Sequence, residues 1–326
     1  KTMKKIFLLL ITTMICVSLF SMGAKDDADY SILNPTNVRV AALKGPTAMG
    51  MVKLMEDSKS SSVNGNSYDF TIVGAPTEIT PMLVKGEVDI AALPANLAAV
   101  IFNSTKGKVR VIAVNTLGVL YICENGNSVN SLEDLKGKTI YSSGKGSTPE
   151  YALNFILEQN GLEDLPIEWK SEHTECVAAL LKDPNAVALL PQPFATTAMV
   201  QNPSIRIALD LNKEWDKVSP ESALLTGVVV ARTDFINENK VAVDNFLESY
   251  KESTDFVNTN IAEGARLIGE VGIVPEKVAA LALPYCNIVC ISGDEMKAIL
   301  PGYLEVLFNA NAKSVGGVLP SEEFYY

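Results

Sequence analysis

The residues best suited to bind a small molecule lie in short turns that follow apolar stretches. From Tyr141 to Leu157, YSSGKGSTPEYALNFIL, the chain runs from a strand pattern through a glycine-rich turn into a helix pattern. A helix that begins at Ser147 or Thr148 leaves its first backbone N–H groups unpaired, so this end can hold an anion or another hydrogen-bond acceptor. Either hydroxyl can cap the helix, and Pro149 and Glu150 suit its first turn.

The glycine-rich turn fits neither of the two common nucleotide-binding patterns. The phosphate loop needs a lysine directly before a serine or threonine, whereas Lys145 precedes Gly146. The dinucleotide pattern G-x-G-x-x-G lacks its third glycine. Two roles for Gly144 and Gly146 therefore stay open: they shape a tight turn between strand and helix, or they let the backbone hold a compact ligand.

Two more turns repeat this arrangement. Gly45, Pro46 and Thr47 precede a second helix pattern, and Pro94 and Asn96 begin a third. Opposed helix ends with small polar residues can hold a compact polar ligand without a dedicated charge. The same residue types also serve as ordinary helix caps, so each turn by itself allows a purely structural role.

His173 is the only histidine of the chain and lies between a strand pattern and a helix pattern. It is either a structural or surface residue, or a ligand contact through one of its ring nitrogens. With Cys176 it would supply only two metal ligands, which makes a weak site. A single histidine also leaves only one base of this kind for nucleophilic catalysis. We therefore predict no catalytic residue, no metal site and no cofactor.

The elements that carry these turns alternate regularly. Between residues 38 and 200, short runs rich in Val, Ile and Ala are followed by turns and then by helical spacing. This alternation predicts an α/β protein with mainly parallel sheets, whose ligands bind beyond the carboxyl ends of the strands. The tail from Thr233 reads as mostly helical. Two long apolar strands, residues 109–125 and Leu224–Arg232, are candidates for hinge crossings, and Trp215 is expected to be partly exposed near them.

Composition and the first residues bear on the compartment and on partners. With 326 residues and 48% hydrophobic content, the chain suffices for one large or two medium globular domains. A formal net charge of −11 argues against a nucleic-acid partner. Lysines followed by the apolar run Ile6–Ala24 are typical of a secretory signal peptide cleaved near Gly23 or Ala24, with an uncleaved anchor as the alternative.

The cysteines are few and scattered. Cys16 follows Met14 and Ile15 rather than small residues, so a lipid anchor is disfavoured. The four cysteines further along do not form the dense framework of a small disulfide-rich domain. Cys286 and Cys290 either pair with each other or stay free and buried.

The chain resembles the substrate-binding proteins of ABC importers, in the subgroup named for nitrate, sulfonate, taurine and thiamine-pyrimidine uptake. The likeness covers nearly the whole chain after the signal and rests on segments that follow one another in this order: LKGPTAMG, KGEVDIAALPAN, AVNTLGVLY, SLEDLKGKTI, GKGSTPEYALNFIL, LLPQPFATTA and LTGVVVARTDF. It implies a two-lobed type II periplasmic-binding-protein fold that closes on a ligand about a hinge of two crossings and delivers it to a membrane permease.

The resemblance also implies a division of the chain and the residues of the cleft. The expected division is a signal peptide at 1–24, a linker at 25–35, the first part of lobe 1 at 36–120, lobe 2 at 121–225, and a return to lobe 1 at 226–326. By position, the cleft would contain Gly45, Pro46, Thr47, Pro94, Asn96, Asn115, Thr116, Gly144, Gly146, Ser147, Thr148, His173, Thr174, Gln192, Pro193 and Thr226.

The favoured function is that of a monomeric exported receptor for a small nutrient, periplasmic or associated with the cell envelope. The chain lacks the cysteine-rich iron motif that some relatives carry, which disfavours an enzyme. The alternatives are an enzyme on the same fold with His173 as acid or base, and a ligand-sensing module for a membrane partner. The cargo stays open between a sulfonate or oxyanion, with Lys44, Lys145 or His173 as a possible cation, and a pyrimidine or vitamin held by a stacking ring and amides.

Overall fold

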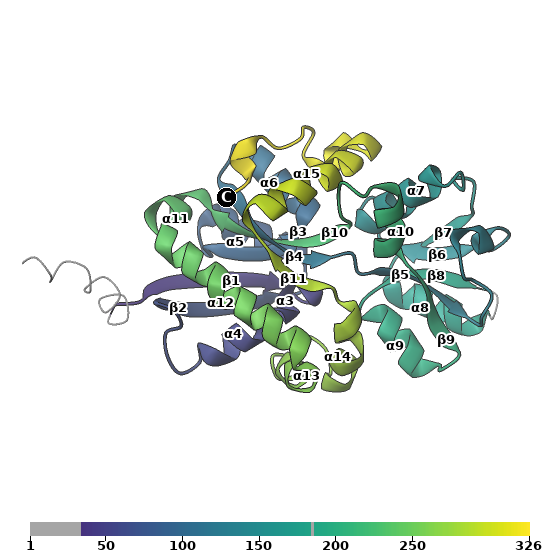
Figure 1. The fold of residues 1–326 in the computed structure, drawn as a ribbon, viewed down its shortest axis with the longest axis horizontal. Coiled ribbons are helices and arrows are strands. Elements are labelled where there is room, and N and C mark those ends of the chain that lie inside the picture. Colours follow the sequence, from purple (N-terminus) through teal and green to yellow (C-terminus); the bar gives the residue numbers. More distant parts are fainter. Residues whose placement is uncertain (1–33, 184–185) are drawn as a thin grey trace, which may run out of the picture.

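The computed structural model describes residues 34–183 and 186–326, which form two lobes around separate sheets (Figure 1). The expectations for the signal peptide, for Cys16 and for most of the linker fall outside these residues. The first sheet has the strand order β11-β4-β10-β3-β1-β2 and the second has the order β7-β6-β8-β5-β9. The α/β prediction and the two-lobed fold are confirmed, but the sheets are mixed rather than mainly parallel, because strands of both sheets also pair in the antiparallel direction.

The first lobe combines the beginning and the end of the chain. Its strands are β1 (Thr36–Leu43), β2 (Asn66–Val73), β3 (Ile90–Pro94), β4 (Val109–Leu117), β10 (Leu225–Arg232) and β11 (Ile288–Ile291). Its helices are α3 (Pro46–Met49), α4 (Val52–Asp57), α5 (Pro76–Lys85), α6 (Ala95–Thr105), α11 (Thr233–Glu238), α12 (Lys240–Thr259), α13 (Ile261–Glu270), α14 (Glu276–Ala282) and α15 (Gly293–Ala310).

The strand directions in the first lobe follow from its connections. The chain between β1 and β3 returns through helices, so β1 pairs in parallel with both β2 and β3. The late strand β10 enters between β3 and β4 and runs antiparallel to both, and β11 adds an antiparallel edge. The tail is therefore mostly helical, as predicted, but it also supplies β11, a strand too short to show a clear alternation.

The second lobe contains β5 (Leu120–Asn125), β6 (Ile140–Ser143), β7 (Ile167–Lys170), β8 (Val187–Pro191) and β9 (Ile205–Asp210). Its helices are α7 (Thr148–Gln159), α8 (His173–Lys182), α9 (Phe194–Gln201) and α10 (Leu211–Val218). Strand β6 pairs in parallel with β7 and β8, whereas β5 runs antiparallel to β8 and β9. The carboxyl ends of β6, β7 and β8 therefore meet at one edge, each followed by a helix.

The chain passes from the first lobe to the second at Gly118, between β4 and β5. The sequence pattern predicted one uninterrupted apolar strand here, but the structure divides it in two. A Cβ atom at Gly118 would lie 2.7 Å from Asn212 Oδ1 and 2.8 Å from Leu224 Cδ2, so only glycine fits. The Gly118 N–H donates to Asn212 Oδ1 at 3.2 Å, which links this crossing to the return path.

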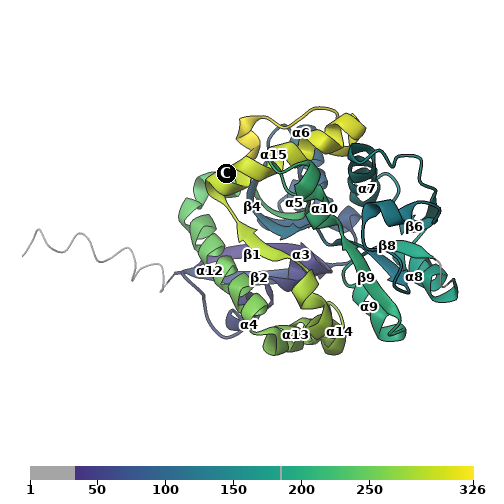
Figure 2. The ribbon, with the colours of Figure 1, turned by 45° about the vertical axis from the view of Figure 1, so that its right-hand side comes forward.

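Three helices close the junction of the lobes on one side. Helix α15 of the first lobe packs against α7, and α7 packs against α10, an arrangement that Figure 2 shows next to β4. Trp215 of α10 is fully buried there, with its ring 4.7 Å from that of Phe155 and 5.8 Å from that of Tyr303. Its indole N–H donates to Ser222 Oγ at 2.9 Å. The expectation of a partly exposed Trp215 is wrong, because only part of the polar sequence around it, including Lys213, Asp216 and Lys217, lies on the exposed side of the helix.

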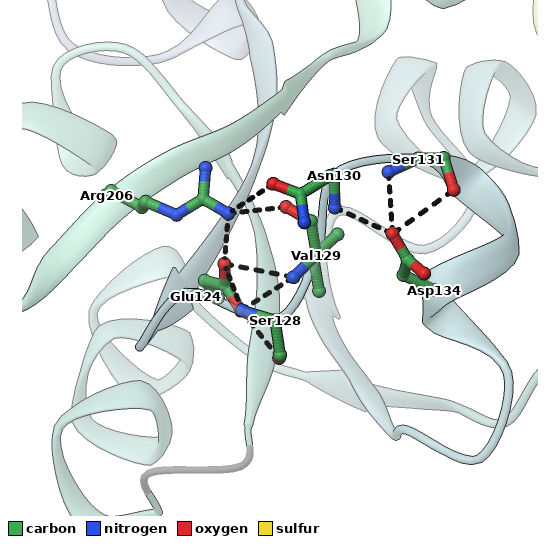
Figure 3. Close-up of polar contacts among 7 residues, drawn as sticks. All are labelled: Glu124, Ser128, Val129, Asn130, Ser131, Asp134 and Arg206. Atoms are coloured by element: carbon green, nitrogen blue, oxygen red, sulfur yellow. Dashed lines mark hydrogen bonds and ion pairs between the residues drawn. The ribbon is translucent and has the colours of Figure 1, made fainter.

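A buried carboxylate anchors the polar insertion at residues 126–138 (Figure 3). Glu124 in β5 is almost fully buried and accepts hydrogen bonds from the backbone N–H groups of Ser128 and Val129 and from the Ser128 hydroxyl. Arg206 of β9 pairs with it at 2.5 Å. Burial raises the pKa of Glu124, but these donors and Arg206 outweigh burial and lower it on balance.

The first lobe contains a second buried carboxylate, Asp89, whose partners include two arginines. Asp89 is almost fully buried before β3 and accepts from Arg39 Nε at 2.9 Å and from Arg232 Nη2 at 2.9 Å. Both arginine side chains are themselves partly exposed. Burial raises the pKa of Asp89, but its hydrogen bonds with the two arginines lower it on balance. The carboxylate joins β1 and β10 to the start of β3.

Two further observations on the described part of the chain concern a disulfide bond and membrane-spanning helices. Cys123, Cys176, Cys286 and Cys290 are free thiols, so Cys286 and Cys290 do not pair. Burial raises the pKa of Cys286 to about 12, as expected for an inert buried thiol. Within residues 34–183 and 186–326, no helix is both long and apolar enough to cross a membrane.

Candidate ligand-binding site

A cavity of about 440 Å³ lies between the lobes, where strands of both sheets end. It is lined by Pro94, Asn96, Leu97, Val119, Leu120, Gly144, Ser147, Thr148, Pro149, His173, Pro191 and Thr226. The structure therefore brings together residues from four separately predicted segments: Pro94, Asn96, Gly144, Ser147, Thr148, His173 and Thr226.

Three helices begin at this cavity. Helices α6, α7 and α8 start at Ala95, Thr148 and His173, directly beside or within the lining residues. The first backbone N–H groups of a helix have no partner inside it, and the aligned peptide dipoles place a partial positive charge at this end. The wall of the cavity is therefore rich in hydrogen-bond donors.

The turn before α7 depends on Gly144. Its φ of 83° lies in the left-handed region, and a Cβ atom would lie 2.9 Å from Ser147 Oγ. Ser147 Oγ donates to the Gly144 carbonyl at 2.5 Å and does not cap the helix, although Ser147 is the residue at the cap position. The prediction of the helix start is confirmed, but the expected side-chain cap by Ser147 is wrong because its hydroxyl closes the turn instead.

His173 reaches the cavity from the first residue of α8. Its Nδ1 lies 2.5 Å from Ser143 Oγ, and its ring centroid lies 4.9 Å from that of Phe194. Burial lowers the pKa of His173 below its ordinary value, because the charged imidazolium loses hydration. The side chain is therefore neutral at pH 7 and presents a polar ring without a full charge.

One residue that lines the cavity also makes a contact between the lobes. Thr148 Oγ1 lies 3.1 Å from the hydroxyl of Tyr303 in α15. Burial raises the pKa of Tyr303, so its hydroxyl stays protonated. On the first lobe, Thr226 Oγ1 donates to the Leu117 carbonyl at 2.6 Å. Thr148 thus connects the ligand cavity to the junction helices.

The lining residues of this cavity carry no Asp, Glu, Lys or Arg. Lys44 is exposed and is not among them, and Lys145 lines a different cavity. No group of three His, Cys, Asp or Glu residues that could hold a metal ion occurs among the described residues. The cavity thus offers neutral donors and apolar walls to a ligand.

The family of ABC-transporter periplasmic substrate-binding proteins described for phosphonate has a model that matches residues 58–276, well over half of the chain. The chain belongs to this family. No curated protein matches it. As a substrate-binding protein, it binds a small ligand outside the cytoplasm and delivers it to an ABC transporter permease, which confirms the predicted role.

Solved structures show the same fold for this substrate-binding protein. An ABC transporter protein from Parabacteroides distasonis is 24% identical, with a TM-score of 0.76 over 89% of this chain and 99% of that chain. The aliphatic sulphonate binding protein SsuA from Escherichia coli is 16% identical, with a TM-score of 0.70 over 90% and 92%. The alkanesulfonate-binding protein SsuA from Xanthomonas axonopodis, bound to MOPS, is 16% identical, with a TM-score of 0.61 over 88% and 96%.

Several first-lobe residues that the resemblance placed in the cleft do not line the cavity of this substrate-binding protein. Asn115 is fully buried, and its Nδ2 donates to the Thr47 carbonyl at 3.0 Å. Thr116 Oγ1 donates to Asn115 Oδ1 at 3.2 Å, and Thr47 Oγ1 donates to the Leu43 carbonyl at 2.8 Å. These side chains fasten the short helix α3, with Gly45 and Pro46 before and within it, to the sheet below.

The remaining second-lobe residues of that set also lie outside the lining. Gln192 is buried, and its Oε1 accepts from Thr196 Oγ1 at 2.8 Å. Thr174 is exposed and donates to Glu172 Oε2 at 3.3 Å. Gly146 lines a separate cavity of about 760 Å³ between α7 and α15, and Pro193 precedes α9. Their role in ligand contact stays a prediction.

Sequence reasoning missed the apolar part of the lining. Leu97, Val119, Leu120, Pro149 and Pro191 all touch the cavity and were not among the predicted residues. Each lies within three residues of a predicted or hinge position, so position along the chain offered a signal. The selection of polar residue types excluded them, although most pockets are walled largely by apolar side chains.

Proposed function

We propose that this substrate-binding protein captures a small organic sulfonate, or another oxyanion with a single negative charge, between its two lobes. The observation that carries the proposal is the combination of three helix starts with a lining that contains no ionised side chain. A ligand rich in acceptors would be held by neutral donors and by the positive ends of the helices.

The charge of the wall favours a monoanion over a dianion. Each helix start contributes the equivalent of about half a positive charge, so three of them supply about one and a half, which balances a monoanion but falls short of a dianion. A sulfonate spreads one charge over three oxygens, whereas a phosphonate takes a second charge near neutral pH, as phosphate groups do. No lining arginine or lysine is available to balance that second charge.

The same lining disfavours a pyrimidine or vitamin as cargo. A flat aromatic ligand would need a stacking ring, and His173 is the only ring side chain among the lining residues besides the prolines. The two structurally similar proteins named for sulphonate and alkanesulfonate binding support a sulfonate here. The cavity volume of about 440 Å³ suits a small molecule.

We also propose that the ligand is bound without being transformed. Ser143 contacts His173, but no carboxylate lines the cavity to orient the ring and support a nucleophile. The lining residues named above would contact the ligand, and the buried set around Asn115 would support the fold beneath it. The proposal also includes the lobe boundaries implied by the resemblance and the signal peptide predicted from the first residues. It further includes a free periplasmic monomer without a nucleic-acid partner.

The test begins with native mass spectrometry of the exported chain, purified without denaturation, to weigh any small molecule that stays bound. Isothermal titration calorimetry then compares ethanesulfonate with ethylphosphonate at about pH 8.5 and about pH 6, where the phosphonate changes from mostly two charges to mostly one. We expect the sulfonate to bind similarly at both values and the phosphonate to bind at least about tenfold more weakly at the higher pH. Tighter phosphonate binding at the higher pH would overturn the monoanion proposal, and consumption of any ligand would favour an enzyme.

A further inference from the structure

A buried serine lies behind the only histidine of the chain. Ser143 is the last residue of β6 and is 2% exposed, and its Oγ lies 2.5 Å from His173 Nδ1. The register of the sheet brings the two together, because Ser143 is paired with Lys170 at the end of β7, and α8 starts at His173 shortly afterwards. Ser143 does not line the cavity itself.

The contact leaves a choice between two tautomers. A neutral imidazole carries one N–H group, and the other ring nitrogen is an acceptor. If the Ser143 hydroxyl donates to Nδ1, the proton lies on Nε2. If Nδ1 donates to Ser143 Oγ, Nε2 is left as a bare acceptor. Since Ser143 occupies Nδ1, Nε2 is the ring nitrogen left to meet a ligand.

The surroundings of Ser143 favour donation to the ring. Its hydroxyl has one proton, and the other acceptor beside it is the sulfur of Cys176, which is a much weaker acceptor than an imidazole nitrogen. The Cys176 thiol is directed to the Glu172 carbonyl, with Sγ 3.7 Å from that oxygen. Phe194 packs against the imidazole ring, so ring and hydroxyl are held in one relative position.

We infer that Ser143 is a positioning residue that fixes His173 as the Nε2–H tautomer, so that an uncharged imidazole donates a hydrogen bond to the bound ligand. The inference rests on the proposed function in one respect, namely that the ligand presents an acceptor to Nε2. The opposite tautomer would direct a lone pair at an oxyanion, beside three helix starts that offer backbone N–H donors. Through Ser143, His173 Nε2 becomes a further hydrogen-bond donor beside the backbone N–H groups of the helix starts, and no charge is added.

The experiment reads the tautomer directly. Because the chain has one histidine, long-range proton–nitrogen NMR of protein labelled with ¹⁵N-histidine gives a single pair of ring-nitrogen signals. The full exported chain is purified without a histidine tag and recorded at about pH 7.5, where His173 is neutral. We expect a protonated Nε2 and an unprotonated Nδ1 in the wild type, and a shift toward a mixture of tautomers in Ser143→Ala.

Two further variants separate positioning from a general loss of structure. Ser142→Ala removes a neighbouring buried hydroxyl, which donates to the Ser143 carbonyl at 3.3 Å, and should keep the wild-type spectrum. Ser143→Thr keeps a hydroxyl and should restore the Nε2–H signature. By calorimetry, Ser143→Ala should weaken ethanesulfonate binding roughly five- to tenfold, as expected for one lost hydrogen bond, and Ser142→Ala less than twofold.

The outcomes are distinguishable from a failure of the proposed function. A wild-type spectrum with the proton on Nδ1, or a Ser143→Ala spectrum identical to that of the wild type, overturns the inference about Ser143. If no sulfonate or other oxyanion binds while the spectra behave as expected, the proposed ligand class is wrong and the tautomer assignment is supported on its own.

Discussion

The two walls of the ligand cavity come from turns that look alike in sequence but use their residues differently. In the first lobe, Thr47 and Asn115 are bonded to their own lobe, and the helix behind the turn, α3, has four residues. In the second lobe, Thr148 and His173 line the cavity at the starts of helices of twelve and ten residues. Thr148 and His173 also make hydrogen bonds within the protein, so what distinguishes them is that each lines the cavity at the start of a full-length helix.

The comparison predicts that changes beneath the first-lobe wall act on stability. Gly227 in β10 faces this buried set, and a Cβ atom there would lie 2.4 Å from Asn115 Oδ1 and 2.6 Å from Thr47 Cγ2. We expect Gly227→Ala to lower the free energy of unfolding by about 3 kcal/mol, because the core would be overpacked. Urea unfolding of the ligand-free protein measures this change.

A matched glycine controls for the loss of backbone freedom. Gly74 is exposed, and the nearest atom to a Cβ there is Glu78 Oε1 at 3.7 Å, an ordinary contact. We expect Gly74→Ala to change stability by less than about 0.5 kcal/mol. A Gly227→Ala protein as stable as the wild type, but with much weaker ligand binding, would show that the first-lobe wall acts in recognition instead.

The buried carboxylates of the two lobes provide a second comparison. Glu124 accepts from backbone N–H groups that cannot turn to water, whereas the partners of Asp89 include two partly exposed arginines that can. We expect Glu124→Gln to lower the free energy of unfolding by about 2 kcal/mol, since donors of fixed position lose acceptors. Asp89→Asn should cost about 1 kcal/mol. Denaturant midpoints of both variants decide the order, and a larger cost for Asp89→Asn would contradict this account.

Much of the fold was accessible from the sequence because local patterns and tertiary structure agree. The short apolar runs became β1, β2, β3, β6 and β8, and each is followed by the predicted helix. The break at Gly118 was not foreseen, because its cause is the approach of Asn212 and Leu224 from far along the chain. The burial of Trp215 has the same kind of cause, since Phe155 and Tyr303 belong to two other helices.

The candidate site was predicted in part for a related reason. Sequence patterns locate turns after strands, so Gly144, Thr148 and His173 were found without knowing what lies opposite them. They do not show whether a side chain is already used by its own lobe, as Asn115 is, or whether a residue such as Leu120 is exposed to a cavity. That distinction depends on contacts between distant segments.

A matched pair of threonines sharpens the comparison of the walls. Thr148→Val removes a hydroxyl that lines the cavity, whereas Thr47→Val removes one that bonds to the Leu43 carbonyl, and both changes keep the β-branched shape. We expect the first to weaken ethanesulfonate binding about fivefold, and also to lower stability by about 1 kcal/mol because the buried Tyr303 hydroxyl loses its hydrogen-bond partner. The second should lower stability by about 1 kcal/mol and change affinity less than twofold. If calorimetry shows that the two variants weaken binding equally, the proposed difference between the two lobes in ligand contact is wrong.

The smallest expected effect concerns His173 and pH. Because burial lowers the folded-state pKa of His173, the unfolded chain binds the proton more readily, starting near its ordinary pKa of about 6.5. The stability of the ligand-free protein should therefore fall as the pH drops from about 7.5 to about 5.5, by less than about 1 kcal/mol. Because the pKa values of Glu124 and Asp89 are lowered, the stability that these two carboxylates contribute is lost only under more acidic conditions, below about pH 5. The melting temperature of His173→Asn over the same range should lack this decline. Asp210, whose pKa is raised by burial, is present in both proteins, so its contribution cancels when the variant is compared with the wild type. A decline that persists unchanged in the variant would mean that another group titrates, and that the second-lobe wall does not hold its imidazole in the neutral form.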